Sequence, residues 1–188
     1  MSTDHSHKPA LAATRVLAEW AAALRYEDLP PEVVAKARTC VLDTIGVCLF
    51  GSTLASVQKL AALVAEEKCA GESAVFGLPL RTSAANAALI NASSAHSFQL
   101  DEIHIEATLH PGATAVPVAL AVAEATGGVS GRDLITALVA GYEVGLRIGI
   151  AAKGGMFARV EILVGVHRQV LQIPIDAVNR LENVQYVY

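Results

Sequence analysis

The chain has few charged residues, no closely paired cysteines and no glycine-rich nucleotide motif. Charged residues make up 17% of its 188 residues and the net charge is -4, so the basic surface that binds nucleic acid is not expected. Its three cysteines, an odd number, form no CxxC pair, which is typical of buried, reduced thiols in a cytosolic protein. Neither a GxGxxG nor a Walker sequence is present.

Targeting and membrane signals are also missing from the sequence. The N-terminus, MSTDHSHKPA, lacks the apolar core of a signal peptide. The most apolar stretch, Gly112 to Gly128, contains Pro117 and Glu124 and is too short to cross a bilayer. We therefore expect a cytoplasmic protein without a membrane span. The hydrophobic content of 53% then predicts a large buried helical core or an oligomer interface.

The hydrophobic pattern predicts an all-α fold, a bundle of successive helices. Apolar residues recur at helical spacing, and proline and glycine mark helix starts and stops. The predicted helices are Leu11–Leu24, Pro31–Gly51, Ser56–Cys69, Thr82 to about Ser97, Ala113–Thr126 and Arg132–Ala152. Ser73–Pro79 is predicted to be a strand-like link. Ser130 is a plausible N-cap, and Glu143 and Arg147 form an i,i+4 pair.

The composition divides the chain into three parts. Residues 1–9 are polar and expected to be disordered, and residues 10–159 form the predicted helical domain. In residues 160–188 alanine almost vanishes, and Val, Ile, Leu and Gln alternate in a way that fits short strands as well as a helix. A shift this sharp predicts a boundary near Arg159.

One stretch gathers the groups that proton-transfer chemistry requires. HSFQLDEIHIEATLHPG, from His96 to Gly112, holds half of the six histidines together with several acidic or amide groups. Its polar members are His96, Gln99, Asp101, Glu102, His104, Glu106 and His110. Histidine changes its protonation near neutral pH, so these residues are the candidates for acid–base chemistry.

The expected geometry depends on where the fourth helix ends. If it continues to His104, then Ser97, Asp101 and His104 share one face, and the aspartate can orient the histidine as a general base. His110 precedes a Pro–Gly break, outside regular helix, with its ring free to point into a cleft. Histidines at a helix end are equally often surface or capping groups. Metal binding by His96, Asp101, His104 and His110 is a lesser alternative, because their spacing matches no known zinc pattern.

Four stretches resemble the MmgE/PrpD family, which includes 2-methylcitrate dehydratase and cis-aconitate decarboxylase. The family's order and spacing are kept over roughly residues 10–158. The stretches are Val41–Ser52, Asn86–His104, Leu109–Glu124 and Leu134–Gly149. The resemblance implies an all-helical main domain, a homodimer and chemistry without a cofactor or metal. The implied reaction is loss of water or carbon dioxide, or epimerisation, next to a carboxylate of a small di- or tricarboxylic acid.

The resemblance also implies roles for individual residues. In the family, the segment HS-x-D-x-D-D…HP lines the active site, and His96, Asp101, Glu102, His110 and Pro111 match it. His110 is then the expected acid or base, and Asp101 orients it or contacts the substrate. The expected substrate-binding residues are His96, Gln99, Glu102 and His104.

Two departures from the family pattern modify this expectation. Gln99 stands where many relatives carry an acidic residue, which favours an isomerase or epimerase over a dehydratase or decarboxylase. Relatives are more than twice as long and continue into a lid-like second domain, so a truncated chain with an unrelated end is expected. The alternative functions are therefore a catalytically inactive, oligomerising remnant and, third, a metal-binding helical protein.

Overall fold

The computed structural model describes residues 11–153, 178–181 and 184–187. They belong to two units, Met1–Met156 and Phe157–Tyr188. The predicted disordered segment, residues 1–9, lies outside the described residues. Within the second unit, β3 (Val178–Leu181) and β4 (Val184–Val187) form an antiparallel pair. This pair agrees with one of the two structures that the alternating composition of residues 160–188 allowed.

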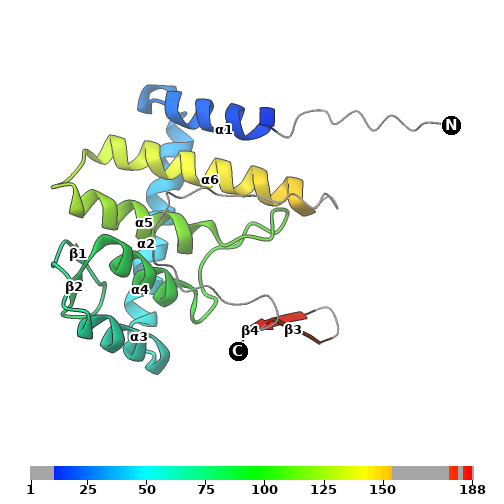
Figure 1. Ribbon diagram of the computed structural model, residues 1–188. Coiled ribbons are helices and arrows are strands. Elements are labelled where there is room, and N and C mark those ends of the chain that lie inside the picture. Colours follow the sequence, from blue (N-terminus) through cyan, green and yellow to red (C-terminus); the bar gives the residue numbers. More distant parts are fainter. Residues whose placement is uncertain (1–10, 154–177, 182–183, 188) are drawn as a thin grey trace. The chain divides into compact units, whose positions relative to one another are not determined.

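The first unit is a helical bundle, as the sequence predicts. Its helices are α1 (Leu11–Ala23), η1 (Tyr26–Asp28), α2 (Pro31–Gly51), α3 (Ala55–Glu66), α4 (Ala84–His96), α5 (Pro111–Ala125) and α6 (Gly131–Lys153). α4, α5 and α6 lie in a row, and α2 packs across all three (Figure 1). α4 and α5 form the most extensive helix contact. The end of α4 and the beginning of α5 are joined by residues 97–110, which carry most of the predicted site.

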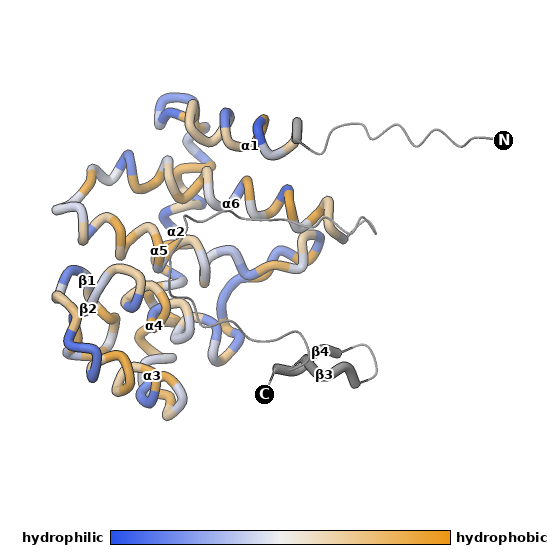
Figure 2. Tube along the Cα trace, viewed as in Figure 1, coloured by the Kyte–Doolittle hydropathy of each residue, from blue (hydrophilic) through white to orange (hydrophobic). Residues whose placement is uncertain are grey.

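The core lies where α3, α4 and α5 meet a short β-hairpin. Its buried side chains are Val57, Ala61, Val64, Val75, Ala87, Ile90 and Ala121. α5 is hydrophobic along most of its length (Figure 2), so it can be buried on several sides. Small residues on α4 and α5 allow the two helix backbones to approach each other closely.

The hairpin of β1 (Ser73–Ala74) and β2 (Arg81–Thr82) occupies the predicted strand-like link. Buried Asn91 on α4 fixes it, since its Oδ1 accepts from the Phe76 amide at 2.8 Å and its Nδ2 donates to Ala74 O at 3.0 Å. Ser73 Oγ donates to Ala121 O on α5 at 2.7 Å. Each bond satisfies a polar group that burial would otherwise penalise.

Most helix boundaries agree with the sequence to within one or two residues, but α3 ends at Glu66 instead of Cys69 and α5 begins before Ala113. Ser130 caps α6 through the Asp133 amide, and Arg147 pairs with Glu143 at 2.9 Å, as expected. Pro111 begins α5 instead of breaking the chain before Ala113. The physical reason is that proline suits the first helical position, where its missing N–H has no intrahelical acceptor.

One described helix is long and apolar enough to cross a membrane. It is the stretch Gly131–Ala152 of α6, and α2 with α3 passes the same test jointly despite an 88° bend. This helix differs from Gly112–Gly128, the stretch that is most apolar in the sequence. One or two such helices are weak evidence for a membrane span, since core helices of soluble proteins also pass this test.

A glycine permits the close crossing of α2 and α4. A Cβ at Gly51 would lie 1.9 Å from the Ser94 carbonyl oxygen, which is backbone and cannot move aside, whereas a Cβ at Gly46 of the same helix meets nothing. We expect Gly51→Ala to lower the free energy of unfolding by about 1–3 kcal/mol through overpacking. Gly46→Ala should raise it by up to about 1 kcal/mol through helix propensity. Urea denaturation measures the free energy of unfolding of both variants. Equal effects of the two substitutions would contradict the close packing of Gly51 against Ser94.

Candidate active site

A buried carboxylate lies at the centre of the candidate site. The Asp101 side chain is 0% exposed, and its Oδ2 lies 3.1 Å from His96 Nδ1 and 3.2 Å from His110 Nδ1. A buried carboxylate is costly unless it is paired and hydrogen-bonded. The two imidazoles are the partners that make this burial possible.

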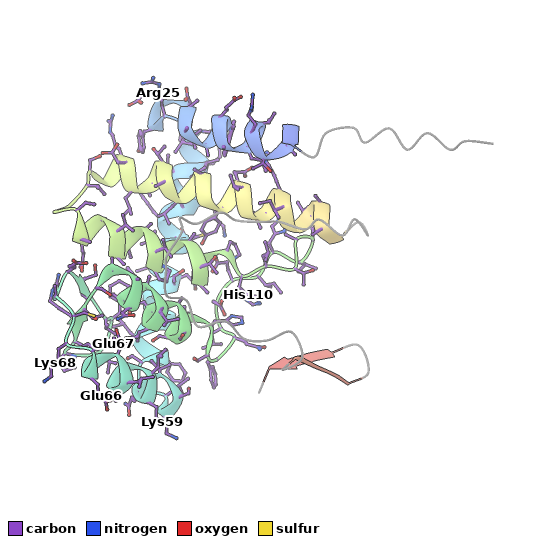
Figure 3. All side chains as sticks on the ribbon, viewed as in Figure 1. Arg25, Lys59, Glu66, Glu67, Lys68 and His110 are labelled. Atoms are coloured by element: carbon purple, nitrogen blue, oxygen red, sulfur yellow. The ribbon has the colours of Figure 1, made fainter. Side chains whose placement is uncertain are left out.

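The two histidines come from opposite ends of one loop. His96 is the last residue of α4, and His110 holds the N-cap position of α5, followed by Pro111. Figure 3 shows His110 on the chain segment that enters α5. The two rings meet edge to face, with centroids 4.7 Å apart. The helix packing of α4 on α5 therefore brings together residues that are fourteen positions apart in the sequence.

The two contacts to Asp101 differ in quality. The His96 contact is a hydrogen bond, whereas His110 Nδ1 has the right distance but no aligned hydrogen bond. Asp101 Oδ1 and His110 Nδ1 are buried without a hydrogen-bond partner among the described residues. Unpaired buried polar atoms are rare and often mark functional sites. The side chain of His110 is 25% exposed, so its ring is accessible to a small molecule.

Glu102 lies beside Asp101 but faces α5 and α6. Its Oε1 accepts a hydrogen bond of 2.6 Å from the Tyr142 hydroxyl. A Cβ at Gly112 would lie 2.4 Å from both carboxylate oxygens, so only glycine admits the carboxylate against the first turn of α5. A helix N-terminus favours negative charge there. Burial, and next the bond to Glu102, raise the pKa of Tyr142, which keeps the hydroxyl a neutral donor.

The fourth helix ends close to the predicted boundary at about Ser97 and does not continue to His104, the alternative that would have placed Ser97, Asp101 and His104 on one face. α4 ends at His96, and Gln99 adopts a left-handed conformation with φ 54°, which a continuing right-handed helix does not contain. Ser97, Asp101 and His104 therefore do not form the expected face. His104 pairs instead with Leu109 through backbone bonds of 2.8 and 3.3 Å, and its Nδ1 accepts from the Ala107 amide.

The structure thus separates the six predicted site residues into two groups. The side chains of His96, Asp101 and His110 meet. Glu102 follows Asp101 in the chain, but its side chain points away from this cluster, towards Tyr142 on α6. Gln99 is exposed and His104 is engaged in its local turn. Sequence reasoning missed Tyr142, and a lone hydroxyl on an apolar stretch of α6 was the available signal.

A thiol packs behind the carboxylate. Cys48 on α2 is 0% exposed and its Sγ donates to Asn91 O at 3.2 Å. Burial, and next the charge of Asp101, raise the pKa of Cys48 to about 12. Cys40 is also buried, with its pKa raised chiefly by burial. The expectation of buried thiols is wrong for Cys69, which lies exposed in the segment after α3, where no helix packs over it.

The same three residues are a possible metal-binding group. His96, Asp101 and His110 each offer one ligand atom, and these atoms lie within 4.8 Å of one another. Three protein ligands are the number that a catalytic zinc site uses. His104, the fourth ligand considered from the sequence, is not part of this group.

Positive side chains do not reach the cluster among the described residues. Arg81 donates to Gly71 O and Glu72 O and pairs with Glu124, while Arg147 pairs with Glu143. The cluster can therefore donate, accept and move protons, but it has no arginine or lysine for a substrate carboxylate.

Comparison with known proteins shows which family the chain matches. The model of the MmgE/PrpD N-terminal domain matches residues 15–173. The chain is 32% identical over 147 residues to the cis-aconitate decarboxylase-like protein oryM of Aspergillus oryzae, covering 75% of this chain and 30% of that protein. It is 29% identical over 157 residues to cis-aconitate decarboxylase of Aspergillus terreus (81% and 32%), and 32% over 135 residues to that of Homo sapiens (69% and 28%). The chain spans about a third of the length of these relatives.

The environment of the cysteines predicts their reactivity. In native protein at pH 8, iodoacetamide should modify Cys69 and leave Cys48 protected, because the thiolate is the reactive form and burial beside Asp101 disfavours it. Mass spectrometry of tryptic peptides measures the labelling. All three cysteines should react in denaturant, which is the control. Labelling of native Cys48 as fast as Cys69 would contradict the burial of this side of the site.

Proposed function

The chain belongs to the MmgE/PrpD family, and from that premise we propose that His96, Asp101 and His110 form the acid–base part of a lyase site. The substrate class is a small di- or tricarboxylic acid, and the reaction occurs next to one of its carboxylates. The observation that carries this proposal is the fully buried Asp101 carboxylate held between two partly exposed imidazoles.

His110 is the proton carrier in this proposal. Its Nδ1 faces Asp101, so Nε2 is the nitrogen left for the substrate. Asp101 orients the ring and stabilises the imidazolium once a proton is bound, which is how a carboxylate supports a histidine base. His96 completes the pairing of Asp101 and, being half exposed, can contact a substrate carboxylate when protonated.

Decarboxylation is the first reaction to test, because the relatives reported above carry that name. The bond from carbon to the departing carboxylate breaks, carbon dioxide leaves, and the electron pair stays on the carbon framework as an enolate-like anion. Protonated His110 then gives its proton to that carbon. In a dehydration or epimerisation, neutral His110 would first remove the proton α to a carboxylate. The exposed side chain of Gln99 has no described hydrogen bond to the cluster, and only its backbone N–H donates to His96 O at 3.1 Å, so this residue does not favour the epimerase.

The second candidate is a catalytically inactive helical module that associates with another protein surface. Two observations favour it: no arginine or lysine among the described residues pairs with the cluster, and large apolar side chains near it are exposed. Phe98 is 53%, Leu100 58% and Ile103 54% exposed, and such surfaces often mark association sites. A homodimer remains a prediction from the family resemblance, and a cytoplasmic location remains a prediction from the sequence.

Metal binding is the third candidate, favoured by the ligand spacing of the cluster. Elemental analysis of protein purified without chelator separates it from acid–base chemistry. The lyase proposal expects no stoichiometric metal and turnover that survives dialysis against a chelator. One equivalent of zinc lost in Asp101→Asn would support the metal site instead.

A thermal melt with small carboxylic acids tests substrate recognition. Citrate, methylcitrate, cis-aconitate and itaconate are the probes, and a ligand that binds only the folded chain raises the midpoint. We expect one acid to stabilise the protein, by about 2.7 kcal/mol at a hundred times its Kd. His110→Ala should abolish the shift. No shift with any acid would favour the inactive module.

Turnover of the stabilising acid tests the catalytic roles. Asp101→Asn keeps the shape of the side chain and removes its charge, and should lower kcat by about 10²–10⁴-fold, the usual contribution of a positioned acid or base. Asp43→Asn makes the same change on an exposed part of α2 and should leave kcat unchanged. Equal activity of both variants would remove Asp101 from the mechanism.

A further inference from the structure

The geometry points to Tyr142 as a positioning residue for His110, acting from α6 through Glu102. This inference rests on the proposed function only for its effect on turnover, because the position of His110 can be measured independently. Tyr142 does not contact His96, Asp101 or His110 through any described hydrogen bond. Its effect must therefore pass through the one carboxylate that it holds.

The first step is the short hydrogen bond between α6 and the loop. Tyr142 Oη donates to Glu102 Oε1 at 2.6 Å, across forty residues of chain. Glu102 Oε2 has no hydrogen-bond partner among the described residues, so the Tyr142 hydroxyl is the described group that fixes this side chain. A hydrogen bond to a charged acceptor is stronger than one between neutral groups.

The second step links Glu102 to the beginning of α5. The carboxylate lies against Gly112, where a Cβ would approach both of its oxygens to 2.4 Å. Gly112 is two residues after His110 and in the first helical turn, where negative charge is favoured. Glu102 also directly follows Asp101 in the chain. A displaced Glu102 side chain would therefore disturb His110 and Asp101 together.

The surroundings of Tyr142 offer its hydroxyl few hydrogen-bond partners besides Glu102. The Tyr142 ring lines a pocket of about 350 Å³ between α2, α5 and α6, whose other lining residues include Val116, Leu138 and Leu146. Cys40, which lines the same pocket, is the other polar group beside the hydroxyl. Removing the hydroxyl leaves the packing of the aromatic ring in place. A displacement of His110 can therefore be distinguished from unfolding of the helical bundle.

The test uses two perturbations of Glu102 from opposite sides. Tyr142→Phe removes the hydrogen bond, and Gly112→Ala places a methyl group where the carboxylate lies. Alanine is the better helix former, so Gly112→Ala would be neutral or stabilising if only helix stability mattered. Tyr26→Phe is the matched control, because it removes a tyrosine hydroxyl that has no described hydrogen bond while keeping the ring that Arg132 stacks on.

The first measurement is the nuclear Overhauser effect between the His96 and His110 rings in the full chain. Their centroid distance of 4.7 Å is short enough for a ring–ring signal. We expect the signal to weaken in Tyr142→Phe and in Gly112→Ala, and to persist in Tyr26→Phe. The ring signal of the double variant should be no weaker than that of the single variant with the weaker signal, because both substitutions act on Glu102.

The second measurement is kcat and KM for the turned-over acid. Misplacement of His110 should lower kcat about tenfold or more, since small errors in catalytic geometry are costly, while KM changes little. If Tyr142→Phe weakens the ring signal but the wild-type chain turns over no acid, the positioning role stands and the proposed function is removed. An unchanged ring signal in Tyr142→Phe, or additive effects of the two substitutions, would overturn the positioning role, even if the melting temperature falls.

Discussion

The burial of the Asp101 carboxylate is the constraint on which the site depends. A charge with no exposed surface must have partners close by, and both partners lie at helix ends, His96 closing α4 and His110 opening α5. The packing of α4 on α5 therefore serves more than stability, because it sets the separation of the two imidazoles. Gly51 contributes to the same arrangement, since it lets α2 approach α4 at Ser94, two residues before His96.

Much of the fold could be predicted from the sequence because helical periodicity and capping act locally. Pro31, Gly51 and Ser130 each mark a boundary through their own backbone or side-chain chemistry. The beginning of α5 was misjudged because Pro–Gly usually signals a turn, whereas here proline occupies the first helical position. The end of α4 was predicted within a residue, at about Ser97, but periodicity left its continuation to His104 open, since the following residues keep polar and apolar spacing that suits a helix.

The sequence indicated the segment that holds the candidate site, but not which of its side chains meet. Asp101 and His110 were singled out from residue type and family pattern, yet the expected partner His104 belongs to a local backbone bridge with Leu109. Which histidine meets Asp101 depends on a left-handed residue at Gln99 and on the crossing of two helices. Neither the backbone conformation of Gln99 nor the helix crossing can be predicted from the i, i+4, i+7 spacing of polar residues along the chain. Tyr142 was missed for the same reason, because its partner Glu102 is forty positions away.

The electrostatics of the loop separate proton transfer from charge recognition. A helix N-terminus would offer a ready site for a substrate carboxylate, but at α5 the Glu102 carboxylate already lies against the first turn. Asp101 adds a second carboxylate next to it, while Arg81 and Arg147 pair with Glu124 and Glu143. An anionic substrate therefore meets, among the described residues, only the histidines as cationic partners, and only when they carry a proton. In the proposed lyase reaction, a proton on His96 or His110 would therefore serve both the binding of the acid and the proton transfer to it.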